Sequence, residues 1–556
     1  MNGPGERSTT RMGVVLGAAA SMAVSLILCG CGSSTPVAQK ADTGRSTSST
    51  LGLPAPTASG AGRGEPPASA VSAPAPLSPA ARERVERFCS ACHPLPQSEN
   101  FPREQWPAEV RLGFDLYRAS LRSDLPEPTE AEAIRYFQEH APTALGIPRA
   151  ADRVEPPSTL RFEPVSVRGI PEQAGPAVAQ VIPCGPELQS AGGAAMFTTD
   201  MRSGEIRRWR IAADVAASGV FASSGHPCRL TPVPNRSDAW FVADLGSYMP
   251  EDHDFGGVSL LVCPGGGPAS SEEWDVAVAG TLTPVRTGLS RVVEARPFDF
   301  DGEAPLDLLV VEFGWRRTGA LRVLLGAGEG GLPTGQRVLD PRHGCLATRI
   351  ADFDGDGADD VVAVFAQEHE TVDVWYRRGP GDFEHRQIHR LPDPSWGSSG
   401  LDVTDIDGDG DPDVLHCNGD TMDSGLPRPT HGVRVLLNEG GKVFENREIA
   451  LLPGVSQATA ADLDGDGDLD VVACALLPSG GGRPAGTFEG MVWIEQTDEG
   501  WRPHTIERDR CEHAAFALAD VDSDGRTDIV AGVFQADAGS SASPVLRVWL
   551  NRPAGR

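Results

Sequence analysis

Residues 352–360 read DFDGDGADD, and this stretch, which recurs in similar form four more times, decides the fold. Acidic residues occupy positions 1, 3, 5 and 9, and an apolar, β-branched run follows. The copies begin at Asp299, Asp352, Asp405, Asp462 and Asp520, so they lie 53 to 58 residues apart. A period of this length indicates stacked or radial structural units with one loop in each unit.

Calcium binding is the chemistry that these loops predict. Oxygen ligands at positions 1, 3, 5 and 9 converge on a hard cation if the chain turns sharply between them, which glycine at position 6 permits. The four complete ligand sets are Asp352, Asp354, Asp356 and Asp360; Asp405, Asp407, Asp409 and Asp413; Asp462, Asp464, Asp466 and Asp470; and Asp520, Asp522, Asp524 and Asp528. An EF-hand is excluded because position 12 is never Glu and lies in a predicted strand.

The first copy, DFDGEAPLD, departs from this pattern. It keeps Asp299, Asp301 and Asp307 but has Glu303 at position 5 and Ala304 where glycine is expected. We therefore predict that it is the weakest calcium site.

A strand, a DxDxDG loop and a second strand at this period resemble the FG-GAP or VCBS repeat of integrin-α-type β-propellers. The resemblance implies a mainly β fold, a seven-bladed propeller over residues 155–553, with calcium on one face. Two degenerate units precede the five clear ones. One is CRLTPVPNRSDAWFVADLGS from Cys228, which keeps the strand and lacks the ligands, and the segment from Met196 is expected to form outer strands of the other.

The front of the chain has a secretory layout. In residues 1–31 two arginines precede an apolar stretch that ends in LCGC. This ending resembles the bacterial lipobox, which implies lipid attachment at Cys31 in preference to Cys29; an ordinary signal peptide or an uncleaved anchor is the alternative. Residues 32–78 are rich in Pro, Ala and Ser and are expected to form a disordered tether. We thus expect an exported bacterial lipoprotein, anchored at the periplasmic face or the cell surface.

A redox signature follows the tether. Cys89, Cys92 and His93 form the CxxCH motif of c-type haem, in which both thiols bind haem covalently and the histidine binds iron. The alternatives are a CxxC disulfide or half of a zinc site, for which no second CxxC exists. Residues 79–150 look like a small, all-α cytochrome c-like domain.

Three helices are predicted in this domain. The first has Ser78 as its N-cap and runs into the CxxCH motif, the second spans residues 106–117, and the third runs from its cap Thr129 to His140. Cytochromes c of the common class supply a distal methionine, but this segment contains none, and Leu112 stands where one is expected. His140 is a candidate substitute or a surface residue, and a five-coordinate iron is the remaining interpretation.

The net charge and the remaining cysteines give further information on partners and on disulfides. The net charge of −29 argues against nucleic acid as a partner. Cys417 and Cys474 occupy equivalent strand positions and are interpreted as small core residues, whereas Cys184 and Cys228 could form a disulfide in the degenerate blades.

Polar side chains share one register in three blades. Asp244, Glu312 and Asn418 each lie thirteen residues past the first loop position and precede a long polar loop. They could line one face of the ring with His253 and His431, but the favoured interpretation is that they stabilise turns.

Three functions fit these features. The preferred one is a membrane-anchored electron-transfer protein that carries covalent haem c and a calcium-binding propeller for docking to a redox partner. The second is a calcium-dependent surface binding or adhesion protein, and the third is a haem-coupled oxidoreductase with its active site on the propeller face. Whether the chain is an enzyme stays open, since no hydrolytic motif is present.

Overall fold

The computed structural model describes residues 76–184, 193–263, 279–422, 424–478, 486–536 and 541–554. The predicted signal peptide, the proposed lipid site at Cys31 and nearly all of the tether lie outside these residues.

Three α-helices come first. They are α1 (Pro79–Cys89), α2 (Trp106–Ala119) and α3 (Glu130–Gln138), with short 3-10 turns η1 (Ser98–Asn100) and η2 (Ala150–Asp152). The side chain of Ser78 caps α1, and Thr129 forms a capping box with Glu132 at the start of α3, as the sequence predicts. The third helix ends two residues before His140, which is exposed.

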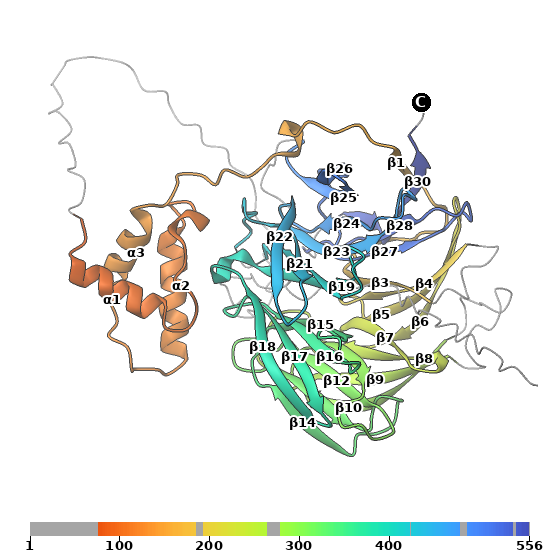
Figure 1. Ribbon diagram of the computed structural model, residues 1–556, viewed down its shortest axis with the longest axis horizontal. Coiled ribbons are helices and arrows are strands. Elements are labelled where there is room, and N and C mark those ends of the chain that lie inside the picture. The colour runs from red at the N-terminus through yellow and green to blue at the C-terminus, as the bar shows by residue number, and fades with distance from the viewer. Residues whose placement is uncertain are drawn as a thin grey trace, which may run out of the picture.

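Trp106 and Phe137 hold the helices together. Their rings stack with centroids 4.2 Å apart, and Phe88 packs edge-on against Tyr117. Figure 1 shows these helices as a separate unit beside the sheets.

Seven four-stranded antiparallel sheets form the rest of the fold, so the predicted seven-bladed β-propeller is confirmed. In chain order the blades are β3 (Val178–Pro183), β4 (Ala194–Asp200), β5 (Glu205–Ile211) and β6 (Ala216–Ser223); β7 (Pro227–Val233), β8 (Arg236–Asp244), β9 (Gly256–Val262) and β10 (Thr281–Leu289); β11 (Val292–Phe298), β12 (Asp307–Glu312), β13 (Ala320–Leu325) and β14 (Gly335–Asp340); β15 (Cys345–Ala351), β16 (Asp360–Phe365), β17 (Thr371–Gly379) and β18 (Asp382–Arg390); β19 (Ser398–Thr404), β20 (Asp413–Asn418), β21 (Gly432–Asn438) and β22 (Phe444–Leu451); β23 (Val455–Ala461), β24 (Asp470–Ala475), β25 (Glu489–Thr497) and β26 (Gly500–Arg508); and β27 (Phe516–Ala519), β28 (Asp528–Gly532) and β30 (Leu546–Pro553) with β1 (Leu160–Val165).

The N-terminal strand closes the ring. β1 pairs antiparallel with β30, from Leu160 opposite Pro553 to Val165 opposite Val548, and so supplies the outermost strand of the last blade. Figure 1 shows the two strands side by side although they come from opposite ends of the propeller sequence. A two-stranded sheet of β2 (Glu172–Ala174) and β29 (Ala542–Pro544) adds a second pairing of this kind. Both pairings join the start of the propeller sequence to its end and so close the ring.

The second strand of each clear repeat is buried along its whole length, from Asp307 in β12 to Gly532 at the end of β28. This burial explains why these strands read as apolar runs rather than as alternating patterns. Their side chains pack against the neighbouring blades as well as within their own.

The structure corrects the details of the two degenerate blades. The segment from Met196 forms β4 and β5, the second and third strands of the first blade, and not its outer strands. In the next blade a tight turn with Asn235 at φ 59° replaces the acidic loop. Cys184 and Cys228 are both free, so the expected disulfide between them is wrong. Cys417 and Cys474 are buried core residues, as predicted.

Candidate functional site

The acidic loops share one face of the propeller. Each connects the first and second strands of its blade, and such connections lie at the same end of every sheet. Carboxylate oxygens from three residues of a loop lie within 4.8 Å of one another in four loops: Asp299, Asp301 and Asp307; Asp352, Asp354 and Asp356; Asp405, Asp407 and Asp413; and Asp462, Asp464 and Asp466. In each of these four loops the structure brings together three of the four ligands that the sequence predicts, and Glu303, Asp360, Asp409 and Asp470 are outside these clusters.

The residue at position 9 has a second role that sequence reasoning missed. Asp360 accepts hydrogen bonds from the backbone N–H of Phe353, at 2.9 Å, and of Arg377, at 2.7 Å. The carboxylate thus ties the loop to the end of the third strand, and it is fully buried. The same pair of bonds recurs at Asp307, Asp413, Asp470 and Asp528. This bond pattern, which we call the latch, accounts for an acidic residue at the start of each second strand.

Burial makes the ionised form of the latch carboxylates less favourable. It raises the pKa of Asp470 to about 7, and the pKa of Asp360, Asp413 and Asp528 to about 6. A nearby cation favours the ionised carboxylate, so an ion in the loop is the natural compensation.

Two carboxylate oxygens indicate that the loops can accept such an ion. Asp354 Oδ1 and Asp405 Oδ1 are buried and make no hydrogen bond. A buried charged oxygen without a partner is unfavourable, and clustered oxygens with sharp glycine turns are what Ca²⁺ prefers. Gly357 and Gly410, at position 6, have φ of 88° and 101°, a conformation that side chains disfavour. The residues present thus fit calcium.

The loops differ in how their charge is balanced by the protein itself. Arg378 lies 2.9 Å from Asp354, and Arg552 pairs with Asp522 and Asp524. Among the described residues no ion pair reaches the acidic loops at 299–307, 405–413 and 462–470. In these three loops no basic side chain balances the carboxylates, so a bound cation would have more effect there than in the other two.

The CxxCH motif lies where α1 ends. Cys89 is the last residue of the helix and is half-buried, and Cys92 is exposed, with its Sγ 3.0 Å from the guanidinium of Arg122. His93 Nδ1 lies 2.8 Å from the carbonyl oxygen of Pro94. When Nδ1 donates to that carbonyl, Nε2 is the nitrogen that can bind a metal, an arrangement typical of ligating histidines. The three residues thus fit covalent haem with His93 as the iron ligand.

The helical unit docks on the propeller. Asp393, between β18 and β19, accepts a hydrogen bond of 2.8 Å from the N–H of Gln97 and another from the side chain of Asn100. Arg428, between β20 and β21, donates to the carbonyl of Asn100 and lies 4.2 Å from the ring centroid of Phe101. Connections between the second and third strands and between blades lie at the opposite end of the sheets from the acidic loops. The helices and the acidic loops therefore occupy opposite faces.

The polar residues of shared register lie on the docking face and stabilise turns there, as the favoured interpretation holds. Asp244 accepts backbone bonds from Gly225 and His226, and Glu312 accepts one from Ser290. The side chain of Asn418 donates to the carbonyl of Thr430. Asp200, at the same place in the first blade, accepts from the N–H of Ala177 and was missed by the sequence pattern.

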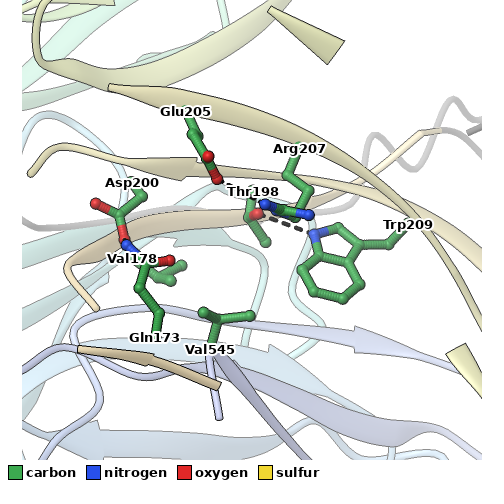
Figure 2. A pocket seen from close by; sticks show the side chains of 8 residues that line it. All are labelled: Gln173, Val178, Thr198, Asp200, Glu205, Arg207, Trp209 and Val545. Carbon is green, nitrogen blue, oxygen red and sulfur yellow. Dashed lines mark hydrogen bonds and ion pairs between the residues drawn. The ribbon is translucent and has the colours of Figure 1, made fainter. Parts of the chain in front are cut away.

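A small pocket lies between the first and last blades. Figure 2 shows its lining, in which Arg207 is paired with Glu205 and the indole of Trp209 donates to Thr198. Its volume is about 10 Å³, room for one water molecule. It is too small for an organic substrate.

Known proteins support the fold. Residues 352–416 match the FG-GAP-like repeat. This match covers the acidic loops at 352–360 and 405–413, the four strands between them and the start of β20. No curated protein matches the chain.

Solved structures of low similarity also match. They include a nidogen/laminin complex (10% identity, TM-score 0.32, covering 56% of this chain and 94% of that chain) and the N-terminal domain of Nup159 (10%, 0.35, 71% and 100%). A third is an ancestral GH74 enzyme (9%, 0.40, 70% and 46%).

Proposed function

We propose that this chain is an exported, membrane-anchored electron-transfer protein, in which a haem c domain is docked on a calcium-binding propeller. The observation that carries the proposal is the CxxCH motif at the end of α1, with Nδ1 of His93 directed at the Pro94 carbonyl. Haem bound there supplies one-electron redox chemistry. The chain's own contribution is to attach, orient and partly cover the cofactor.

The propeller in this proposal is a rigid platform. The ring of seven blades, five of which have a latch at their acidic loop, presents one face to the helical unit and leaves the calcium face for another macromolecule. Asp393 and Arg428 fix the haem domain on this platform. A redox partner would then meet a defined arrangement of the two domains.

The decisive experiment is a visible spectrum of the full chain produced in a host with haem-attachment machinery. Denatured protein should retain covalently bound colour, and the reduced pyridine adduct should show the c-type band. Cys92→Ser should weaken or abolish attachment, whereas Cys263→Ser, a buried propeller thiol, should leave it unchanged. Colourless protein from a competent host contradicts the proposal.

Anchoring rests on the sequence pattern alone. Among the described residues no helix is long and apolar enough to cross a membrane. We propose that lipid at Cys31 holds the protein at the membrane, with residues 32–78 as the tether. Cys31→Ser should release the protein into the soluble exported fraction, and Cys29→Ser should not; the reverse result places the lipid on Cys29.

Calcium-dependent binding of a surface protein or glycan is the second proposal. It is favoured by the five acidic loops, whose tips are exposed on the face away from the helices and are free to meet a ligand there. If protein prepared without haem binds a surface ligand when calcium is present and releases it when a chelator is added, the haem is not required for this function. The oxidoreductase proposal requires reduction of the haem by a substrate.

A further inference from the structure

His343, Glu368 and His369 form a cluster away from the acidic loops and the CxxCH motif. One ligand atom from each lies within 4.8 Å of the other two. His343 Nε2 is 2.9 Å from Glu368 Oε1, and the two imidazole rings have centroids 5.4 Å apart. From this geometry we propose that the three side chains bind a divalent first-row transition metal ion.

The donor set selects the class of ion. Two imidazole nitrogens and one carboxylate oxygen suit Zn²⁺ or Fe²⁺ and do not suit Ca²⁺, which takes six to eight oxygens. Metal–ligand bonds of about 2.0 Å at the tetrahedral angle place two ligand atoms about 3.3 Å apart. The observed 2.9 Å between His343 and Glu368 needs only a few tenths of an ångström of expansion.

His369 supplies an independent observation. Its Nε2 is buried and has no hydrogen-bond partner. A buried polar atom without a partner is uncommon in proteins and calls for an explanation, one of which is a missing ion. An ion pair between His343 and Glu368 explains those two residues but leaves the nitrogen of His369 without a role.

The backbone holds the cluster in place. The turn that carries Glu368 and His369 has two non-glycine residues in the left-handed region, Gln367 at φ 61° and Glu370 at φ 49°. Such backbone is costly and persists where the surroundings impose it. The N–H of Ala366 donates to the carbonyl of Gly344, next to His343, so the two segments are fixed relative to each other.

The cluster also lies next to the docking region. The carboxylate of Glu370 accepts a hydrogen bond of 2.7 Å from the backbone N–H of Ser398, and its carbonyl oxygen accepts one from the N–H of Leu391. Leu391 and Ser398 lie on either side of Asp393 in the sequence. The proposed ion therefore lies in the same layer of loops as the contacts with the helical unit. Three protein ligands leave at least one coordination position for water or another small ligand.

Zinc is the probe for the experiment. The full chain is stripped with chelator, dialysed against Zn²⁺ with excess Ca²⁺ to occupy the acidic loops, and its zinc is counted by mass spectrometry. His369→Ala should lose about one zinc per chain relative to the unmodified protein, as should His343→Ala. His385→Ala is the matched control, because His385 also pairs with a carboxylate, Asp373 at 2.7 Å, and is not one of the three residues of the proposed site.

A second kind of variant keeps the test valid if the alanine variants fail to fold. Glu368→Gln preserves size at a partly exposed position and should weaken zinc binding at least tenfold, with zinc no longer raising the melting temperature as it does in the unmodified chain. The proposal is overturned if His369→Ala and Glu368→Gln bind as much zinc as the unmodified chain, or if His385→Ala loses the same amount.

Discussion

Arg428 of the propeller lies over the ring of Phe101 in the helical unit, with 4.2 Å between the guanidinium carbon and the ring centroid. The same side chain donates to the carbonyl of Asn100 and, at 2.6 Å, to that of Ser395. One buried arginine thus joins the helices to two loops of the propeller. Because the group is charged and desolvated, these bonds outweigh an ordinary surface contact.

Arg428→Ala should therefore loosen the docking without unfolding either part. Loss of the charge-assisted bond to Asn100 and of the cation–π contact with Phe101 predicts a cost of about 2 to 3 kcal/mol at the interface. Amide hydrogen exchange at residues 97–101 should accelerate. Arg447→Ala, which removes an exposed arginine paired with Glu445, is the control and should change nothing there. Unchanged exchange in Arg428→Ala contradicts the docking described above.

Removal of calcium should lower the stability of the full chain. Carboxylates held within 4.8 Å of one another repel when no cation separates them, and a site saturated at 100 times its Kd contributes about 2.7 kcal/mol. Melting with chelator and with excess calcium measures the effect. Asp464→Ala should reduce the calcium-dependent shift more than Asp301→Ala, since the loop at 299 lacks the glycine and has Glu303 outside its cluster. Equal midpoints in both conditions would sink the calcium proposal.

The latch predicts destabilisation even when calcium is saturating. Asp470→Ala removes the acceptor of two backbone N–H groups, a buried one at Leu463 and a partly buried one at Gln496. We expect a loss of about 3 kcal/mol or more in the free energy of unfolding. Asp468→Ala changes an acidic residue of the same loop outside position 9 and is the control. Similar denaturation midpoints for the two variants contradict the latch.

Two histidines, the buried His416 and the partly buried His389, predict a loss of stability in acid. Burial, with the charge of Arg434, lowers the pKa of His389 to about 4, and burial beside His389 and Arg434 lowers that of His416 well below its usual value. The unfolded chain binds protons at these groups near pH 6.5 and the folded chain does not, so stability present above pH 6.5 is lost as the pH falls towards 4. For His389 this amounts to about 3 kcal/mol.

The measurement is chemical denaturation from pH 7 to pH 4 in the unmodified chain and in His389→Gln. The slope of stability against pH should be shallower in the variant. His140→Gln, at an exposed position, should keep the slope of the unmodified chain. A slope unaffected by His389→Gln shows that other groups cause the loss.

The sequence was sufficient to predict the propeller ring but not the contacts between distant segments. The repeated DxDxDG loops predicted the blades and the clustering of Asp352, Asp354 and Asp356, because the residues that form each loop are neighbours in the sequence. The pairing of β1 with β30 joins segments nearly 400 residues apart, and no local pattern reports it. The contact of Asp393 with Asn100 and the meeting of His343 with His369 likewise depend on tertiary packing.

The structural role of position 9 could have been suspected from the sequence. Asp stands there in all five loops, including the first, which lacks the glycine and carries Glu at position 5. A residue needed only for the metal has no reason to persist in the weakest site. Its bonds to the third strand, such as Asp307 to Gly326, give that reason.

Haem bound at His93 should lack methionine as its second axial ligand. No methionine occurs in residues 76–148, and Leu112, at the place where one is expected, is about half exposed on α2. In the propeller Met196 and Met201 are fully buried, and Met422, in the loop that carries Arg428, packs in the propeller core. The oxidised full chain should therefore show no band of methionine-to-iron ligation, and its potential should be lower than that of His/Met cytochromes, because thioether ligation raises the potential.

His140→Ala should leave the spectrum unchanged if the iron is five-coordinate, and Met249→Leu tests the exposed methionine of the docking face. A methionine band that disappears in Met249→Leu or Met422→Leu contradicts this prediction and shows that the propeller completes the haem site.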